Sequence, residues 1–195
     1  MRRMMIAALG LSLLLGLTGC GAKNTADGDL LSRASGIPSE ETLLTVDGRE
    51  VEAWRYLYWL AYTCDSIQTA YQDAGTELNW DAAFEDGSLS DYAREQALAD
   101  TVLYAVVETW AEERDCTLTE EDRAAMEADW EAASQDYGGE DAYLAALGEL
   151  GLDRQRAQTL SQAAYLYDRL RARACDPESA DYPTAEDLAD FSQKS

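Results

Sequence analysis

Two of the side chains most used in acid–base and nucleophilic catalysis, histidine and lysine, are absent or rare in this chain of 195 residues. The sequence contains no histidine, which excludes a Ser-His or Cys-His catalytic pair. Its two lysines, Lys23 and Lys194, stand near the two ends of the chain and leave no lysine base inside a folded domain. The 38 acidic residues must include close carboxylate pairs, but such pairs alone do not indicate a glycosidase or a protease. The sequence therefore favours binding over catalysis.

Cysteine is a further reactive side chain in this sequence. Setting Cys20 aside leaves Cys64, Cys116 and Cys175, an odd number, so at most one intramolecular disulfide can form and one thiol is left over. No two of them make a C-x-x-C pair, and the lack of histidine argues further against a zinc or redox site. We expect no cofactor and no metal, and we expect these three cysteines to be core or helix-end residues.

The first twenty residues carry a different kind of chemistry. Arg2 and Arg3 precede an apolar run over residues 4–17, which is short for a membrane span and has the right length for the core of a signal peptide. Residues 17–20 (LTGC) resemble the bacterial lipobox, in which the cysteine is acylated and becomes the mature N-terminus. The resemblance implies a signal peptide over residues 1–19, a lipidated Cys20, and a location on the extracytoplasmic face of a bacterial cell membrane. The alternatives are an uncleaved anchor or a cysteine that stands there by chance.

Residues 20–41 are predicted to be the lipidated cysteine and a flexible tether, because they are small, polar and unpatterned. Removal of Arg2 and Arg3 with the signal peptide would change the formal net charge of the chain from −23 to −25. Nucleic acid and anionic lipid head groups repel such a surface, so we expect no nucleic-acid partner and contact with the membrane through the acyl group only. The same charge favours basic polypeptide partners.

A folded domain is predicted over residues 42–182, with a linker or tail over residues 183–195. Asp47 and Gly48 form a favoured tight-turn pair between two short apolar runs and predict a strand–turn segment. From Trp54 to Tyr71, apolar and aromatic residues recur at helical spacing and cover more than a normal stripe. This helix is therefore either buried on most sides or offers aromatic rings to a partner. Residues 75–90 interrupt the pattern and are predicted to form a loop.

Residues 92–174 contain no proline and are predicted to form four consecutive helices. Thr119, followed by three acidic residues, is a signal for a helix N-terminus. Gly138 and Gly139 supply the left-handed backbone that is common at helix ends, and Asp153 is the expected N-cap of the last helix. The predicted fold class is all-α, with about five to six helices and a short N-terminal strand–turn segment.

Apolar residues at steps of three and four predict which side of each helix faces the core. None of these helices could bury its stripe alone, so they must pack on one another. The predicted faces are Leu98, Val102, Leu103, Val106 and Trp110 in the first helix, Met126, Trp130, Ala133 and Tyr137 in the second, and Leu160, Ala164, Tyr167, Leu170 and Ala174 in the last.

Aromatic residues with a polar group dominate, since the chain has five tryptophans and eleven tyrosines against two phenylalanines. Indole and phenol rings suit a contact surface that is apolar yet tolerates water. The alternative is that most of them are core residues of a helical bundle. The candidates for lining a groove that binds other polypeptides are Trp54, Tyr58, Tyr62, Trp130 and Tyr137.

Four short segments, in their order and spacing, resemble the N-terminal chaperone domain of the SurA and PrsA foldases. They are residues 46–51 (VDGREV), 115–121 (DCTLTEE), 137–144 (YGGEDAYL) and 151–153 (GLD). The resemblance covers residues 43–191 and implies a helical domain that holds unfolded or secreted polypeptides in a bacterial envelope. In that family a parvulin-type prolyl isomerase domain commonly follows, and residues 183–191 resemble the linker into it.

Together these observations predict a membrane-anchored extracytoplasmic lipoprotein that binds unfolded or partly folded polypeptides without catalysis. The isomerase activity of the family is not transferred, because a parvulin active site typically uses histidines and this chain has none. Two alternatives remain open. One is a peptidyl-prolyl cis-trans isomerase whose catalytic domain is missing from this sequence. The other is a scaffolding lipoprotein that docks one folded partner.

Overall fold

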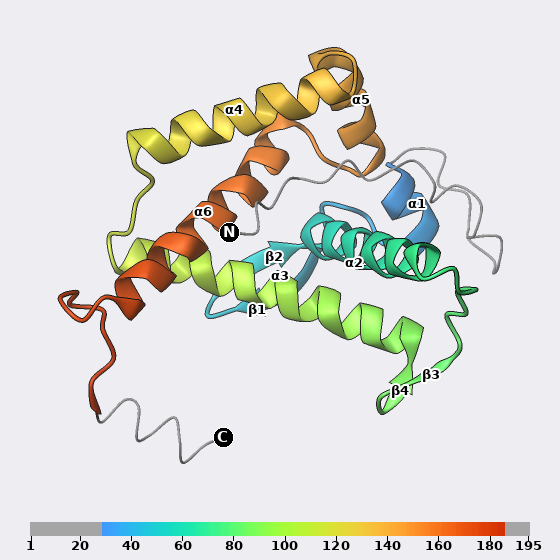
Figure 1. Ribbon diagram of the computed structural model, residues 1–195, viewed down its shortest axis with the longest axis horizontal. Helices are drawn as coiled ribbons and strands as arrows, with labels where there is room; N and C mark the ends of the chain where they lie inside the picture. The colour runs from blue at the N-terminus through green and yellow to red at the C-terminus, as the bar shows by residue number, and fades with distance from the viewer. Residues whose placement is uncertain (1–28, 186–195) are drawn as a thin grey trace.

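The computed structural model describes residues 29–185, so the predicted signal peptide, Cys20 and the end of the predicted tail lie outside the described part of the chain. The described residues form six helices and two small antiparallel sheets, which confirms the all-α prediction with its N-terminal strand–turn segment. In Figure 1, α6 crosses between α4 and α5 above and α3 below. The elements are α1 (Leu30–Ser35), β1 (Thr42–Val46), β2 (Arg49–Glu52), α2 (Ala53–Asp73), β3 (Ala83–Phe84), β4 (Gly87–Ser88), α3 (Leu89–Glu113), α4 (Glu120–Asp136), α5 (Glu140–Glu149) and α6 (Arg154–Cys175).

The strand–turn prediction is confirmed by the β1–β2 hairpin. Asp47 and Gly48 have φ angles of 49° and 83°, the left-handed pair that a two-residue hairpin turn requires. Val51 on β2 is 1% exposed and anchors the hairpin in the core. On the other side, the Arg49 Nε donates to the Thr109 hydroxyl of α3 at 3.3 Å. The hairpin therefore braces the C-terminal half of α3.

The segment before the hairpin differs from the predicted tether. Residues 29–41, the described part of that tether, contain the short helix α1. Asp29 caps this helix by accepting a hydrogen bond from the Ser32 amide at 2.8 Å, and the Ser32 hydroxyl lies 2.6 Å from that of Ser39. The Asp29 carboxylate also packs against Gly151, where a Cβ atom would lie only 2.9 Å from it. Small polar residues therefore serve here as a cap and a docking contact.

The centre of the fold is the pair α2 and α3, which lie side by side in Figure 1. The rings of Trp59 and Tyr104 stack between them with centroids 4.9 Å apart and planes only 3° from parallel. Most sides of the first half of α2 are buried. For this half of the helix, the first alternative, burial on most sides, therefore holds, and its aromatic rings are not offered to a partner. The main core consists of Trp54, Tyr58, Trp59, Ala97, Tyr104, Trp130, Tyr143, Leu147, Leu152, Ala157, Leu160 and Ala163.

The predicted core face of α3 is wrong. Leu98, Leu103 and Trp110 are 45%, 40% and 47% exposed. The opposite side of the helix faces the core, because its small residues let α2 and α6 approach closely. Thr101 fits among them, since its hydroxyl donates to the Ala97 carbonyl at 2.7 Å and leaves no unpaired donor. The buried residues of α3 are Leu89, Ala93, Ala97, Thr101, Tyr104, Ala105, Val107 and Ala111.

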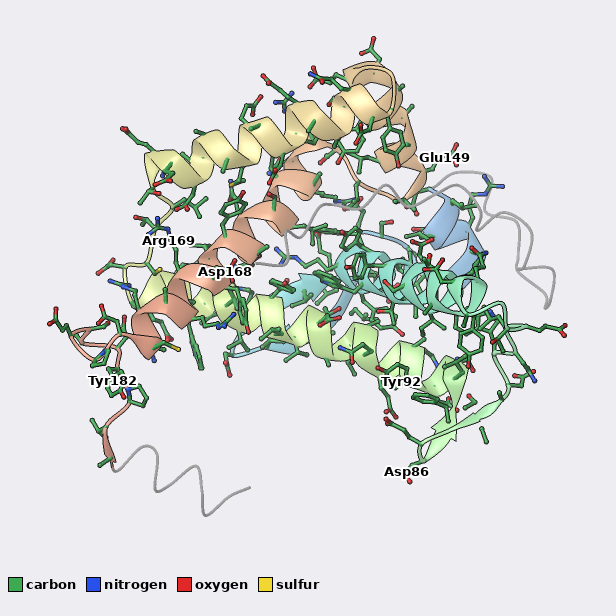
Figure 2. All side chains as sticks on the ribbon, in the orientation of Figure 1. Asp86, Tyr92, Glu149, Asp168, Arg169 and Tyr182 are labelled. Atoms are coloured by element: carbon green, nitrogen blue, oxygen red, sulfur yellow. The ribbon has the colours of Figure 1, made fainter. Side chains whose placement is uncertain are left out.

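The segment predicted as a loop, residues 75–90, contains the small β3–β4 hairpin and the start of α3. Ser88 caps α3 by accepting from the Asp91 amide at 3.1 Å, and the Asp91 carboxylate accepts from the Ser88 amide at 3.0 Å. The helix consequently begins at Leu89. The ring centroids of Phe84 on β3 and Tyr92 on α3 lie 4.8 Å apart, and Figure 2 labels Tyr92.

The predicted boundaries of the last three helices are confirmed. The Thr119 hydroxyl accepts from the Asp122 amide at 3.2 Å at the start of α4. Gly138 and Gly139, with φ angles of 86° and 131°, turn the chain from α4 into α5. Asp153 accepts from the Arg156 amide at 2.8 Å and starts α6.

The predicted face of α6 is correct only in part. Leu160 and Leu170 are buried, whereas Tyr167 is 36% exposed and Ala174 is exposed. Cys175, the last residue of α6, is exposed, and all three cysteines of the described region are free thiols. Among residues 29–185, no helix has the length and apolar character needed to cross a bilayer.

Candidate binding groove

A groove of about 360 Å³ runs between α4 and α6, with α5 at one end. Its volume lies in the range of about 300–1,000 Å³ that is usual for ligand-binding sites in proteins. We call it the α4/α6 groove. It is lined by Leu118, Arg123, Met126, Glu127, Asp129, Trp130, Ala132, Ala133, Asp136, Tyr137, Tyr143, Ala157, Gln158, Ser161 and Gln162.

The floor of the groove is aromatic. The Trp130 and Tyr143 rings meet edge to face, with centroids 4.9 Å apart, and Tyr137 lies 5.2 Å from Tyr143. Trp130 and Tyr143 are 8% and 2% exposed, so they form a fixed base, while Met126, Ala133 and Tyr137 are half-buried. The groove therefore offers packed apolar surface to an incoming side chain.

The charged side chains along the groove are mainly acidic. Glu127, Asp129 and Asp136 stand against one cation, Arg123. The α6 side contributes uncharged polar groups, among them Gln158. An apolar floor with an acidic rim is complementary to a polypeptide that carries apolar side chains together with basic ones.

Polar contacts between α4 and α6 hold the two walls together. The Tyr165 hydroxyl donates to the Asp129 carboxylate at 3.1 Å. Near the start of α4, Arg169 of α6 pairs with Asp122, and Figure 2 labels Arg169 on this part of α6. The two contacts join the walls at two places, seven residues apart on α4 and four residues apart on α6.

Trp130 is also held from the side of α5. Its indole N–H donates to the Glu140 carboxylate at 3.2 Å, and Arg154 pairs with the same carboxylate. The Arg154 guanidinium lies 4.7 Å from the centre of the Trp130 ring, close enough for a cation–π contact. A second ion pair joins Arg154 to Glu127 at 3.3 Å. The aromatic floor is thereby fixed by α4, α5 and α6 together.

The titratable phenols of the groove stay protonated at neutral pH. Burial, with a further contribution from Tyr137, raises the pKa of Tyr143 to about 12. Burial also raises the pKa of Tyr137, and the nearby carboxylate of Asp65 on α2 acts in the same direction. A raised pKa makes these hydroxyls weaker acids, so they are not activated for proton transfer. In the described part of the chain, no group of three or more cysteines and carboxylates is placed to hold a metal ion.

The structure brings two of the five predicted groove residues together, Trp130 and Tyr137. Trp54 and Tyr58 are 5% and 4% exposed and belong to the core. Tyr62 is half-buried on α2, 6.4 Å from the Tyr58 ring, and lies outside the groove lining. This placement leaves Trp130 of α4 and Tyr137, the residue that directly follows α4, as the candidates supported by geometry.

Several groove residues were not predicted as site residues. Tyr143 could not be recognised as a candidate from the sequence, because it lies on a short apolar helix without a clear amphipathic pattern. Ser161 and Gln162 belong to the polar side of α6, which carries no signal until α4 is placed next to it. A signal for α4 did exist, since its whole predicted face, Met126, Trp130, Ala133 and Tyr137, lines the groove.

Comparison with known proteins gives no match to this chain among protein-family models, curated proteins or solved structures.

Proposed function

We propose that this protein is an extracytoplasmic, lipid-anchored domain that holds unfolded or partly folded polypeptides in the α4/α6 groove and forms or breaks no covalent bond. The observation that carries the proposal is the composition of the groove. Its floor is built from the Trp130, Tyr137 and Tyr143 rings, and its rim is acidic. Unfolded chains expose apolar side chains, and such a floor gains free energy by covering them.

The chemistry of the groove also supports binding in preference to catalysis. The chain has no histidine, and the groove offers no lysine. Its phenols are protonated at neutral pH at their ordinary pKa of 10, and burial moves the pKa of Tyr143 further from neutrality, to about 12. The resemblance of four sequence segments to the chaperone domain of SurA and PrsA foldases favours the same class of function.

Suppression of aggregation tests the proposal directly. The mature chain is mixed with heat-denatured citrate synthase, and light scattering is followed over time. Near a stoichiometric ratio, we expect the chain to reduce the scattering strongly. If a tenfold molar excess leaves the scattering unchanged, the proposal fails. Tight binding of one folded protein, with no effect on denatured chains, would support the scaffolding alternative instead.

A matched pair of substitutions assigns the activity to the groove. Ser161→Trp places a large ring into the groove from α6 and is expected to remove most of the effect on scattering. Ser66→Trp makes the same change at an exposed position of α2, outside the groove lining, and is expected to leave the effect intact. Met126→Glu adds a charge to the apolar wall and should act as Ser161→Trp does. Equal activity of all three variants would show that the groove is not the binding site.

A further inference from the structure

The side of α3 that faces away from the core carries a continuous apolar surface. We call Leu98, Val102, Leu103, Val106 and Trp110 the α3 outer stripe. Leu98, Leu103 and Trp110 are 45%, 40% and 47% exposed, and the two valines are half-buried. From Leu98 to Trp110 the helix rises by about 18 Å. Contiguous apolar surface of this kind marks interaction sites more often than scattered single residues do.

The elements packed against α3 leave the larger side chains of this stripe exposed. Trp59 of α2 stacks on Tyr104 of α3, and α6 packs on Val107 and Ala111. These three residues of α3 lie on its buried side. The β1–β2 hairpin reaches α3 through Arg49, which pairs with Glu112 at 2.6 Å. Within residues 29–185 these contacts leave Leu98, Leu103 and Trp110 40–47% exposed, whereas Val102 and Val106 are half-buried.

The stripe is flanked by one acidic residue at each end. Glu95 lies seven residues before Val102 and Glu113 seven residues after Val106, so two helical turns place both on the side of the stripe. Both are exposed, and neither pairs with a basic side chain within the described region. The neighbouring cations have other partners. Arg94 pairs with Asp91, and Arg114 pairs with Asp181 at 3.1 Å while its guanidinium lies 5.3 Å from the centre of the Trp110 ring.

We propose that the α3 outer stripe is a docking surface for a basic amphipathic helix of a partner protein. The partner's apolar residues would cover the stripe, and its lysines or arginines would pair with Glu95 and Glu113. These two residues are 18 positions apart, or about 27 Å along the helix. The ridges of one helix pack into the grooves of another, so an uncovered helix face with apolar ridges fits a helix.

A second copy of this chain fits the surface poorly. An antiparallel pair of α3 helices centred on the stripe would place Glu95 of one copy against Glu113 of the other. A parallel pair would place each glutamate against its own counterpart. Both arrangements juxtapose like charges in a protein whose net charge is already −23. The charge pattern therefore selects a partner of opposite sign.

Two synthetic peptides test the proposal. Both form an amphipathic helix of about 22 residues with one leucine face. One carries lysines at its two ends, and the other carries glutamates at the same positions. Binding to the full mature chain is measured by fluorescence anisotropy. We expect the lysine peptide to bind about tenfold more tightly than the glutamate peptide or better. No binding of the lysine peptide, or equal binding of both, would overturn the proposal.

Variants separate the stripe from general attraction to an acidic protein. Leu98→Ser with Leu103→Ser should weaken binding of the lysine peptide about tenfold. Glu95→Lys with Glu113→Lys should abolish the tighter binding of the lysine peptide relative to the glutamate peptide. Glu131→Lys with Glu149→Lys makes an equal change of charge at exposed positions elsewhere and should preserve this difference. If both charge variants behave alike, attraction is non-specific and the proposal is wrong.

Two further measurements complete the test. Ser161→Trp, in the α4/α6 groove, should leave peptide binding unchanged, which keeps this surface distinct from the groove. Sedimentation of the wild-type chain should give a monomer. A dimer that Leu98→Ser with Leu103→Ser dissociates would identify a second copy as the occupant and overturn the proposal. Circular dichroism spectra of all variants should match the wild type, because the substituted leucines and glutamates are exposed and Ser161 is half-buried at the wall of a groove.

Discussion

The guanidinium group of Arg154 lies 4.7 Å from the centre of the Trp130 ring, across the junction between α6 and α4. The same arginine pairs with Glu127 and with Glu140, and Glu140 accepts the indole N–H of Trp130. One side chain at the start of α6 thus ties together the three helices that form the groove. Its loss should therefore affect both the stability of the domain and the order of the groove floor.

Replacement of Arg154 by alanine is expected to lower the free energy of unfolding by about 1 kcal/mol. The cation–π contact contributes about 0.5–1 kcal/mol, and an exposed ion pair about 0.2–1 kcal/mol. Urea denaturation measures the change. Arg171→Ala, at an exposed position of the same helix, serves as the control and should stay within about 0.5 kcal/mol of wild type. Equal stability of the two variants would show that the Arg154 contacts contribute nothing.

The orientation of α3 predicts opposite effects for two tryptophans. Trp59 is 6% exposed and stacks on Tyr104, so Trp59→Ala should cost about 3–5 kcal/mol or prevent folding. Trp110 is 47% exposed and contacts Arg114, so Trp110→Ala should cost less than about 1 kcal/mol. Urea denaturation of both variants provides the comparison. A large loss for Trp110→Ala would mean that the outer stripe faces the core after all.

The start of α4 should make stability depend on pH in acid. The Arg169 side chain, with hydrogen bonds from Thr119, lowers the pKa of Asp122 to about 2, against 3.8 for an ordinary aspartate. A carboxylate with a lowered pKa stabilises the folded state above the unfolded pKa, and that stabilisation is lost as the pH falls from about 4 to about 2.

Asp122→Asn removes this ionisable group. At neutral pH it should reduce the free energy of unfolding by about 1 kcal/mol, through the lost ion pair and the weakened N-terminal cap. Urea titrations at several pH values should show the difference between wild type and variant shrinking as the pH falls toward 2. A difference that stays constant over this range would contradict the assignment to Asp122.

The lipid anchor is tested at Cys20, which lies outside the described residues. Expressed with its signal sequence in a bacterium, the wild-type chain should appear in the membrane fraction, and mass spectrometry should find acyl chains on the N-terminal cysteine. Cys20→Ser removes the acylated atom and should prevent this modification. Unmodified Cys20 in the wild-type protein would contradict the lipoprotein prediction, and Cys64→Ser is the matched control that should change nothing.

The sequence was most informative where a structure depends on neighbouring residues. The Asp47-Gly48 turn, the Thr119 and Asp153 caps and the glycine exit of α4 were all predicted correctly. Each depends on hydrogen bonds or backbone angles within about four residues. For the same reason, the number and order of the four C-terminal helices could be predicted. The groove side of α4 was also present in its stripe, through Met126 and Trp130.

Which side of a helix becomes buried could not be predicted from the sequence alone, because it depends on the helices that pack against it. On α3 the larger apolar residues, such as Leu98 and Trp110, suggested one face, but Ala97 and Thr101 on the other face allow α2 to come close. In the same way, Trp54 and Tyr58 look like Trp130 in sequence, yet only Trp130 meets the space between α4 and α6. The sequence by itself determined the helices and their ends, through local hydrogen bonding and backbone preference. Only the tertiary structure decided which apolar surface is covered, because that depends on how closely distant segments can pack.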